Sequence, residues 1–136
     1  MSETTAKNEY KECRDFKAWQ AGHEFNQELQ LWAQEYEDPK LDRWVFELLT
    51  SARESVVQVM EAFRKYHGPE KIRRYDAAIF YLNRIDYTLE LGDELGWWKS
   101  GELRPKLDDY RRIIRSTLVK FIPKTDEKSS PETTIG

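Results

Sequence analysis

Chemistry in this sequence would have to rest on two histidines and a single cysteine. His23 and Glu24 begin like the zinc-binding motif H-E-x-x-H, but the fifth position is Gln27, so the second ligand on that helix face is missing. A di-iron bundle needs Glu-x-x-His, whereas Gln20 stands three residues before His23, and His67 falls in a predicted turn. We therefore expect no metal and no cofactor.

Nucleophilic catalysis and glycine-loop phosphate binding are not indicated either. Cys13 has no histidine near it in the sequence, so we expect a free surface thiol in or beside a flexible N-terminus. The six glycines are scattered and form no G-x-x-x-x-G-K loop. We expect no catalytic residue and no small-molecule substrate, and the protein is predicted not to be an enzyme.

Asp86 is the acidic residue closest to a predicted helix interface. It lies between Leu82 and Leu89, although Ile85 can take the inward position if the helix rotates slightly. A buried carboxylate needs a cationic partner, such as an arginine from a neighbouring helix or subunit. We predict a salt bridge at Asp86 rather than a catalytic role.

Cationic residues form two groups that could contact phosphates. The first surrounds a predicted turn, with aromatic and histidine side chains between the charges, and the second lies on the last predicted helix. Several cations acting together give affinity for a nucleic-acid backbone, and a solvated face paired with Glu and Asp is the alternative. The candidate nucleic-acid or partner-binding residues are Arg64, Lys65, Lys71, Arg73, Arg74, Arg111, Arg112 and Arg115.

Length and charge limit the protein classes that remain. The 136 residues suit one domain, and the net charge of −3 argues against a protein that coats nucleic acid generally. Residues 1–50 hold six Lys or Arg against eleven Asp or Glu, whereas residues 51–122 hold fourteen against eleven. No apolar stretch resembles a signal peptide or a membrane span, so we expect a soluble, cytoplasmic protein without membrane partners.

Apolar periodicity predicts four helices and no strand. The helices are expected at about residues 15–36, 39–66, 69–95 and 101–122, with Asp15, Asp38 and Ser100 as N-caps and glycines 68 and 96 ending two of the helices. Residues 1–13 are expected to be flexible, and the polar tail 123–136 to be disordered. In the second helix the clearest seam steps by 4, 3, 4, 3 and 4 residues through Val45, Leu49, Ala52, Val56, Val59 and Phe63.

Four amphipathic helices with short turns predict an all-α fold, an antiparallel up-down-up-down four-helix bundle over residues 14–122. Apolar residues also fall beside the seams. They favour an oligomer, although a wider core within one subunit is the alternative. These residues are Trp44, Phe46, Leu48, Phe80, Tyr87, Ile113 and Leu118.

Three segments resemble one family. Residues 15–25, DFKAWQAGHEF, are similar to the D-L-x-V-W-Q-K-A-H-E-L opening of four-helix-bundle proteins encoded by intervening sequences of bacterial 23S ribosomal RNA genes. Residues 59–64 resemble that family's I-A-E-G-F-G segment, and residues 82–97 resemble its third helix, which ends in D-L-G-Y. The resemblance covers roughly residues 13–122. Residues 55–63 lack the Pro, Asn and Gly of the family's S-I-P-A-N-I-A-E-G-F segment.

That departure places the chain nearer a branch that contains the accessory variability determinant proteins of diversity-generating retroelements. The resemblance implies a homopentamer that serves as an accessory or scaffold protein in a nucleic-acid-handling complex, with a reverse transcriptase and RNA or DNA as partners. Family members tend to be basic and this chain is not. The alternative is a purely structural protein-interaction module that uses exposed Trp97, Trp98 and an acidic first helix, with no nucleic acid.

Overall fold

The computed structural model describes residues 13–123, and over this range the chain is all helical. Four helices follow one another: α2 (Lys17–Ala33), α3 (Asp42–Arg64), α4 (Gly68–Leu95) and α5 (Leu103–Leu118). Short 3-10 turns, η1 (Gln34–Tyr36) and η2 (Val119–Phe121), extend α2 and α5. The predicted flexible segment up to residue 12 and the predicted disordered tail from residue 124 lie outside the described residues.

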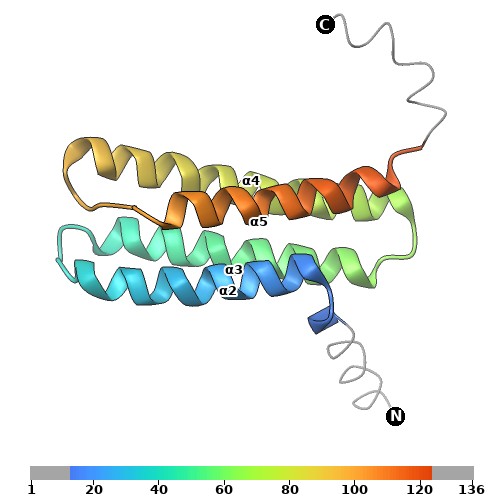
Figure 1. Ribbon diagram of the computed structural model, residues 1–136, viewed down its shortest axis with the longest axis horizontal. Helices are drawn as coiled ribbons and strands as arrows, with labels where there is room; N and C mark the ends of the chain where they lie inside the picture. The colour runs from blue at the N-terminus through green and yellow to red at the C-terminus, as the bar shows by residue number, and fades with distance from the viewer. Residues whose placement is uncertain (1–12, 124–136) are drawn as a thin grey trace, which may run out of the picture.

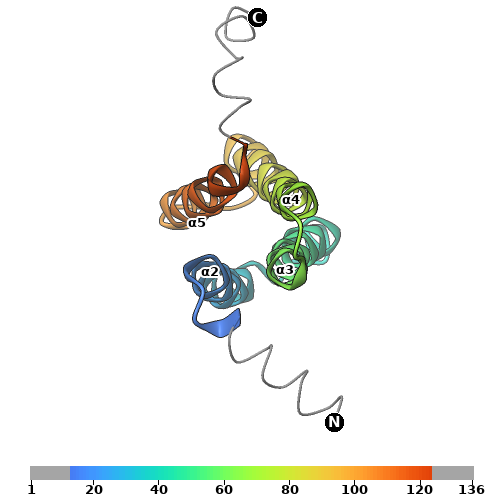
Figure 2. The same cartoon turned by 90° about the vertical axis from the view of Figure 1, so that its right-hand side faces the viewer.

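The helices lie side by side, with the α2–α3 and α4–α5 turns at one end and the α3–α4 turn at the other (Figure 1). Viewed from the end, α3 lies between α2 and α4, and α5 packs on both α4 and α2 (Figure 2). We call the end with the α3–α4 turn the turn end and the opposite one the far end. Within residues 13–123, no helix has both the length and the apolar character that crossing a bilayer requires.

Two predicted starts of helices are wrong for local hydrogen-bonding reasons. Asp38 does not cap α3, because its carboxylate accepts a hydrogen bond from the Lys40 amide at 3.0 Å and closes a turn, so α3 begins only at Asp42. Ser100 does not cap α5, because its hydroxyl and amide both bond the Asp93 carboxylate at the end of α4. Short polar side chains readily form such local turns in place of helix caps.

Of the remaining predicted helix boundaries, the one at Gly96 is confirmed and those at Asp15 and Gly68 are wrong. Asp15 makes no cap, since α2 follows Phe16 without a side-chain cap bond. Gly96 does end α4 in the left-handed conformation, at φ 75°. Gly68 has no positive φ and instead opens α4 together with Pro69, while α3 ends earlier at an extended Lys65.

The buried face of α3 differs from the predicted seam. Of its six seam residues, Ala52 and Val59 are buried, whereas the other four are only half-buried. The fully buried positions include Leu48, Ser55 and Ala62 instead. Because α3 packs against both α2 and α4, its core face points between these neighbours and not toward one of them.

Tyr110 of α5 joins three helices in the middle of the bundle. Its hydroxyl lies 2.9 Å from the hydroxyl of Ser55 on α3, which also donates to the carbonyl oxygen of Ala52 at 2.7 Å. The ring passes α2 at Gly22, where an added Cβ would stand 2.5 Å from the Tyr110 hydroxyl. A glycine is therefore needed at position 22 for Tyr110 to reach α3.

Tryptophans close the far end. Trp98 is buried and donates from Nε1 to the carbonyl oxygen of Leu89 at 3.0 Å, while its ring lies against Gly92. The Trp32 ring meets the Trp98 ring edge to face, with centroids 5.4 Å apart, and the ring of the half-buried Trp97 is tilted against that of Trp44 at 5.1 Å. The expectation of an exposed recruiting residue is wrong for Trp98, which is buried among other aromatic rings, whereas Trp97 is half-buried.

Candidate nucleic-acid or partner interface

Three of the predicted cations meet in one shallow hollow at the turn end. Lys65, Arg73 and Arg74 line a depression of about 340 Å³ together with Glu70 and Ala77. The hollow forms because α3 ends at Arg64 in an extended turn and α4 starts again at once, which brings Lys65 beside the first turns of α4. Arg74 is held by a hydrogen bond from Nη1 to the Gln58 side chain at 3.2 Å.

Lys71 has a role inside the turn. Its Nζ donates to the carbonyl oxygens of Ala62 and Phe63 at 3.0 and 3.5 Å, and it lies 5.4 Å from the centre of the Phe121 ring. Both carbonyls lie in the last turn of α3, where a helix lacks its full set of backbone donors, and the Ala62 oxygen also accepts the Lys65 amide at 3.2 Å. Desolvation lowers the pKa of Lys71. Lys71 of α4 therefore links the end of α3 to α4 and lies close to η2.

Arg111 is engaged within the bundle. Its guanidinium side chain is 14% exposed and bonds Asp86 at 3.2 Å, Asp108 at 2.6 Å and the Asn83 side chain at 3.0 Å. Arg104 joins the same carboxylate at 2.9 Å. The predicted salt bridge at Asp86 is confirmed, with arginines from α5 as its partners. Arg111 thus ties α5 to α4.

The other predicted cations remain on the surface. Arg112 pairs with Asp109 at 3.0 Å, with both side chains exposed, and Arg64 lies 3.9 Å from Glu61. Surface pairs of this kind contribute little to stability and exchange readily for other partners. Arg115 is exposed and makes no ion pair with any residue between 13 and 123. Phosphates could reach these three arginines.

The fold collects charge of opposite sign at its two ends. In the half of the bundle with the turn end, residues 13–24, 53–76 and 109–123 hold twelve Lys or Arg against seven Asp or Glu. The other half, residues 25–52 and 77–108, holds six against twelve. An excess of one sign over one surface raises the local concentration of counter-charged ligands despite the small net charge.

Sequence reasoning missed two cations at this end. Lys17 of α2 and Lys120 of η2 line a second hollow of about 430 Å³ together with Arg112 and the apolar Phe16. The two lysines are 103 positions apart in the chain, and only the packing of α2 against α5 brings them to one hollow. Neither lies in a basic run, so the sequence carried no local signal for them.

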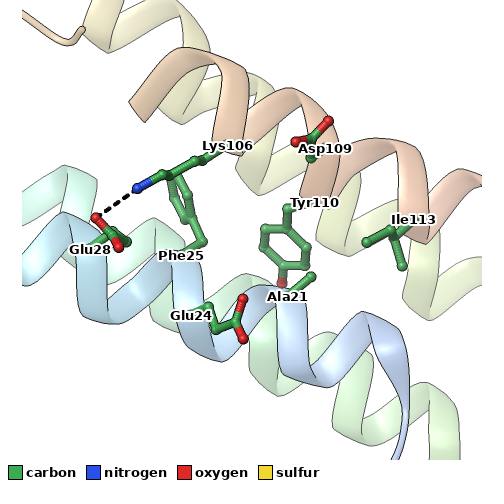
Figure 3. Close-up of a pocket in the computed structure, with 8 residues that line it drawn as sticks. All are labelled: Ala21, Glu24, Phe25, Glu28, Lys106, Asp109, Tyr110 and Ile113. Carbon is green, nitrogen blue, oxygen red and sulfur yellow. Dashed lines mark ion pairs between the residues drawn. The ribbon is translucent and has the colours of Figure 1, made fainter. Parts of the chain in front are cut away.

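A third hollow, of about 220 Å³, lies between α2 and α5 (Figure 3). Glu28 and Lys106 pair across it at 3.0 Å, and Phe25 and Tyr110 form its apolar wall. The Tyr110 hydroxyl is turned toward Ser55 of α3. Among residues 13–123, no group of three or more His, Cys, Asp or Glu side chains is placed to hold a metal ion.

Cys13 is buried, which corrects the expectation of a surface thiol. Its residue is 3% exposed and belongs to the apolar core. Burial raises the pKa of the thiol to about 11. Burial also raises the pKa of Tyr75 to about 12, with a further contribution from Cys13, and the Tyr75 hydroxyl has no hydrogen-bond partner within the described residues. Since the thiolate is the reactive form, Cys13 is unsuited to act as a nucleophile.

We predict that Cys13 of the folded protein resists iodoacetamide at pH 8, because its raised pKa keeps the thiol protonated and the core shields it. Mass spectrometry should show alkylation at least tenfold slower than in 6 M guanidinium chloride. Equal rates in the two solvents would contradict the buried position.

Comparison with known proteins identifies no relative. The chain matches no family model, no curated protein and no solved structure. Its candidate interface therefore rests on its own geometry: Lys65, Arg73 and Arg74 around one hollow, at the cationic end of an all-helical protein.

Proposed function

We propose that the protein is a non-enzymatic, homo-oligomeric accessory or scaffold protein of a cytoplasmic nucleic-acid-handling complex, built on an antiparallel up-down-up-down bundle. Phosphates of RNA or DNA contact its turn end. A reverse transcriptase is the protein partner that the family resemblance implies. The observation that carries the proposal is the excess of cations at this end, with Lys65, Arg73 and Arg74 around one hollow.

The size of the patch limits the affinity of one copy. Each neutralised phosphate adds a modest, salt-dependent gain, and strong binding needs several such contacts. Three of the eight candidate cations are held by bonds within the subunit: Lys71 to carbonyl oxygens of α3, Arg74 to Gln58 and Arg111 to Asp86. Repetition of the patch over the copies of an oligomer makes up for the small number of cations in each.

Fluorescence anisotropy with a labelled single-stranded RNA tests this proposal. We expect binding that weakens steeply as salt rises from 50 to 300 mM, and a loss of at least tenfold in the double variant Lys65→Glu, Arg74→Glu at 50 mM. The matched control, Lys40→Glu with Arg43→Glu, reverses two exposed cations at the far end. It should change affinity by less than about twofold to threefold, because salt largely screens charges that lie far from the bound phosphates.

Two outcomes would overturn the phosphate contact: no binding at 50 mM salt, or equal losses in both double variants. Circular dichroism of each variant must retain the helical signal, so that a loss of binding is not a loss of fold.

A second candidate function is a protein-interaction module without nucleic acid. It is favoured by exposed apolar side chains on the outside of α4, where Phe80 and Tyr87 are 59% and 65% exposed. Such side chains suit a protein surface better than a phosphate backbone. Retained assembly without any RNA affinity would select this candidate.

A further inference from the structure

Helix α4 is apolar on two sides. Its inner side carries the core residues Tyr75, Leu82 and Leu89, which are fully buried. One side of α4 faces away from the other three helices (Figure 2). Large apolar side chains are also exposed along α4, where Phe80 is 59%, Tyr87 65% and Leu95 58% exposed. A helix that is apolar all round is normally buried on all sides. The outer side of α4 therefore lacks a partner within one subunit.

The outer side has the spacing of a coiled-coil seam. Its positions step by 4, 3, 4, 3, 4 and 3 residues, as in heptad contacts between two helices. Both ends of the stripe are charged and its middle is mostly apolar. We call these residues the outer stripe: Arg73, Ala77, Phe80, Arg84, Tyr87, Leu91 and Glu94.

We infer that the outer stripe packs against the outer stripe of a second copy, with the two α4 helices antiparallel about a two-fold axis near Arg84. The spacing is nearly symmetric about that residue, since the stripe residues lie 4, 7 and 11 positions before Arg84 and 3, 7 and 10 positions after it. In this register Phe80 faces Tyr87 of the second copy, and small Ala77 faces large Leu91 of the second copy. Aromatic pairs and small-against-large contacts are what close helix packing uses.

Charge selects the antiparallel direction. In this register Arg73 at one end of the stripe meets Glu94 of the second copy, and the same pair forms again at the other end. A parallel pair would place Arg73 beside Arg73 and Glu94 beside Glu94. The two-fold pairing also sets the cationic half of one bundle against the acidic half of the other, where the described charges differ in sign.

Arg84 lies at the centre of the stripe, so the two copies of this residue meet near the axis. Each is already paired within its own subunit, and repulsion between them is therefore reduced. The Arg84 guanidinium bonds the Glu47 carboxylate of α3 in the same subunit at 2.8 Å. On the two-fold axis, two such ion pairs come together, and each carboxylate can serve both guanidiniums. The stripe from Arg73 to Glu94 is about 32 Å long at 1.5 Å per residue.

This inference rests on the proposed function only for the existence of an oligomer, and it adds the surface and the symmetry. It predicts an even number of subunits. The pentamer that the family resemblance implies needs a head-to-tail contact instead. Because Arg73 borders both surfaces, the RNA experiment above uses Lys65 and Arg74, so that the two proposals can fail separately.

Light scattering after gel filtration measures the mass directly. We expect twice the 16.3 kDa of one chain for the wild-type protein, or a larger even multiple, at 50 μM. Phe80→Glu should lower the number of subunits, because a charged side chain at this position disrupts the contact between the two outer stripes. The matched control is Phe46→Glu, because Phe46 is 70% exposed on α3 and lies outside the outer stripe. It should leave the mass unchanged.

Charge reversal tests the direction. Arg73→Glu should weaken the dimer at least tenfold, and adding Glu94→Arg to the same chain should restore it. Disulfide formation tests the position of the two-fold axis. Arg84→Cys should form a disulfide between two copies of the same variant. Arg73→Cys should form one with Glu94→Cys when the two variants are mixed, but not with a second copy of Arg73→Cys.

A monomer at 50 μM, a mass of five subunits, equal effects of Phe80→Glu and Phe46→Glu, or Arg73→Cys cross-linking to itself would each overturn the two-fold pairing. A five-subunit mass with intact RNA binding would leave the proposed function standing. Absence of RNA binding from an intact two-fold dimer would overturn only the phosphate contact.

Discussion

Replacing Gly92 by alanine should destabilise the protein by about 3 kcal/mol, although alanine normally favours a helix over glycine by about 1 kcal/mol. The reason is steric. A Cβ at position 92 would lie 2.0 Å from the Cε2 atom of Trp98. The ring is buried and fixed by its hydrogen bond to Leu89, so it cannot move aside without leaving the aromatic cluster at the far end.

Urea denaturation followed by circular dichroism measures this effect, and a double-mutant cycle assigns it to Trp98. In a Trp98→Leu background the same Gly92→Ala change should be neutral or stabilising, because the smaller side chain leaves room for the methyl group. The comparison substitution Gly96→Ala has open space around it but a positive φ, so it should cost only about 1 kcal/mol of backbone strain. A similar Gly92→Ala cost in both backgrounds would contradict the close approach.

Replacing Tyr110 by alanine should cost about 4 kcal/mol, the usual range for removing a buried aromatic ring. The ring is 1% exposed and fills the space between α2, α3 and α5. Tyr110→Phe keeps the ring and removes only the hydroxyl. It should cost about 1 kcal/mol, because the Ser55 hydroxyl retains its bond to Ala52.

The same unfolding measurement separates the two Tyr110 variants. A second readout is ultraviolet titration of tyrosine: burial raises the pKa of Tyr110 well above the ordinary range, so its ionisation should appear only when the protein unfolds at alkaline pH. If Tyr110→Phe proved as damaging as Tyr110→Ala, the packing of the ring between the helices would not be its main contribution to stability.

Parts of the candidate interface could be predicted from the sequence and parts could not. The turn-end cations Lys65, Arg73 and Arg74 are close in the chain, and a tight helix turn keeps such residues close in space. Arg111 and Lys71 belong to the same basic groups, yet Arg111 forms an ion pair with Asp86 and Lys71 donates hydrogen bonds to carbonyl oxygens of α3. Charge type alone does not reveal whether an internal partner lies within reach.

The amino-acid sequence by itself determined that the chain forms four helices and approximately where they lie, because apolar periodicity, proline and glycine act over a few neighbouring residues. The seven-residue spacing of Tyr75 and Leu82 in α4, and of Leu107 and Ile114 in α5, also places each pair on one helix face, and all four residues are buried. Only the tertiary structure decided the burial of Cys13 and Trp98, the rotation of α3 and the segregation of charge between the two ends. Each of these depends on contacts between residues distant in the chain, and local periodicity carries no information about them.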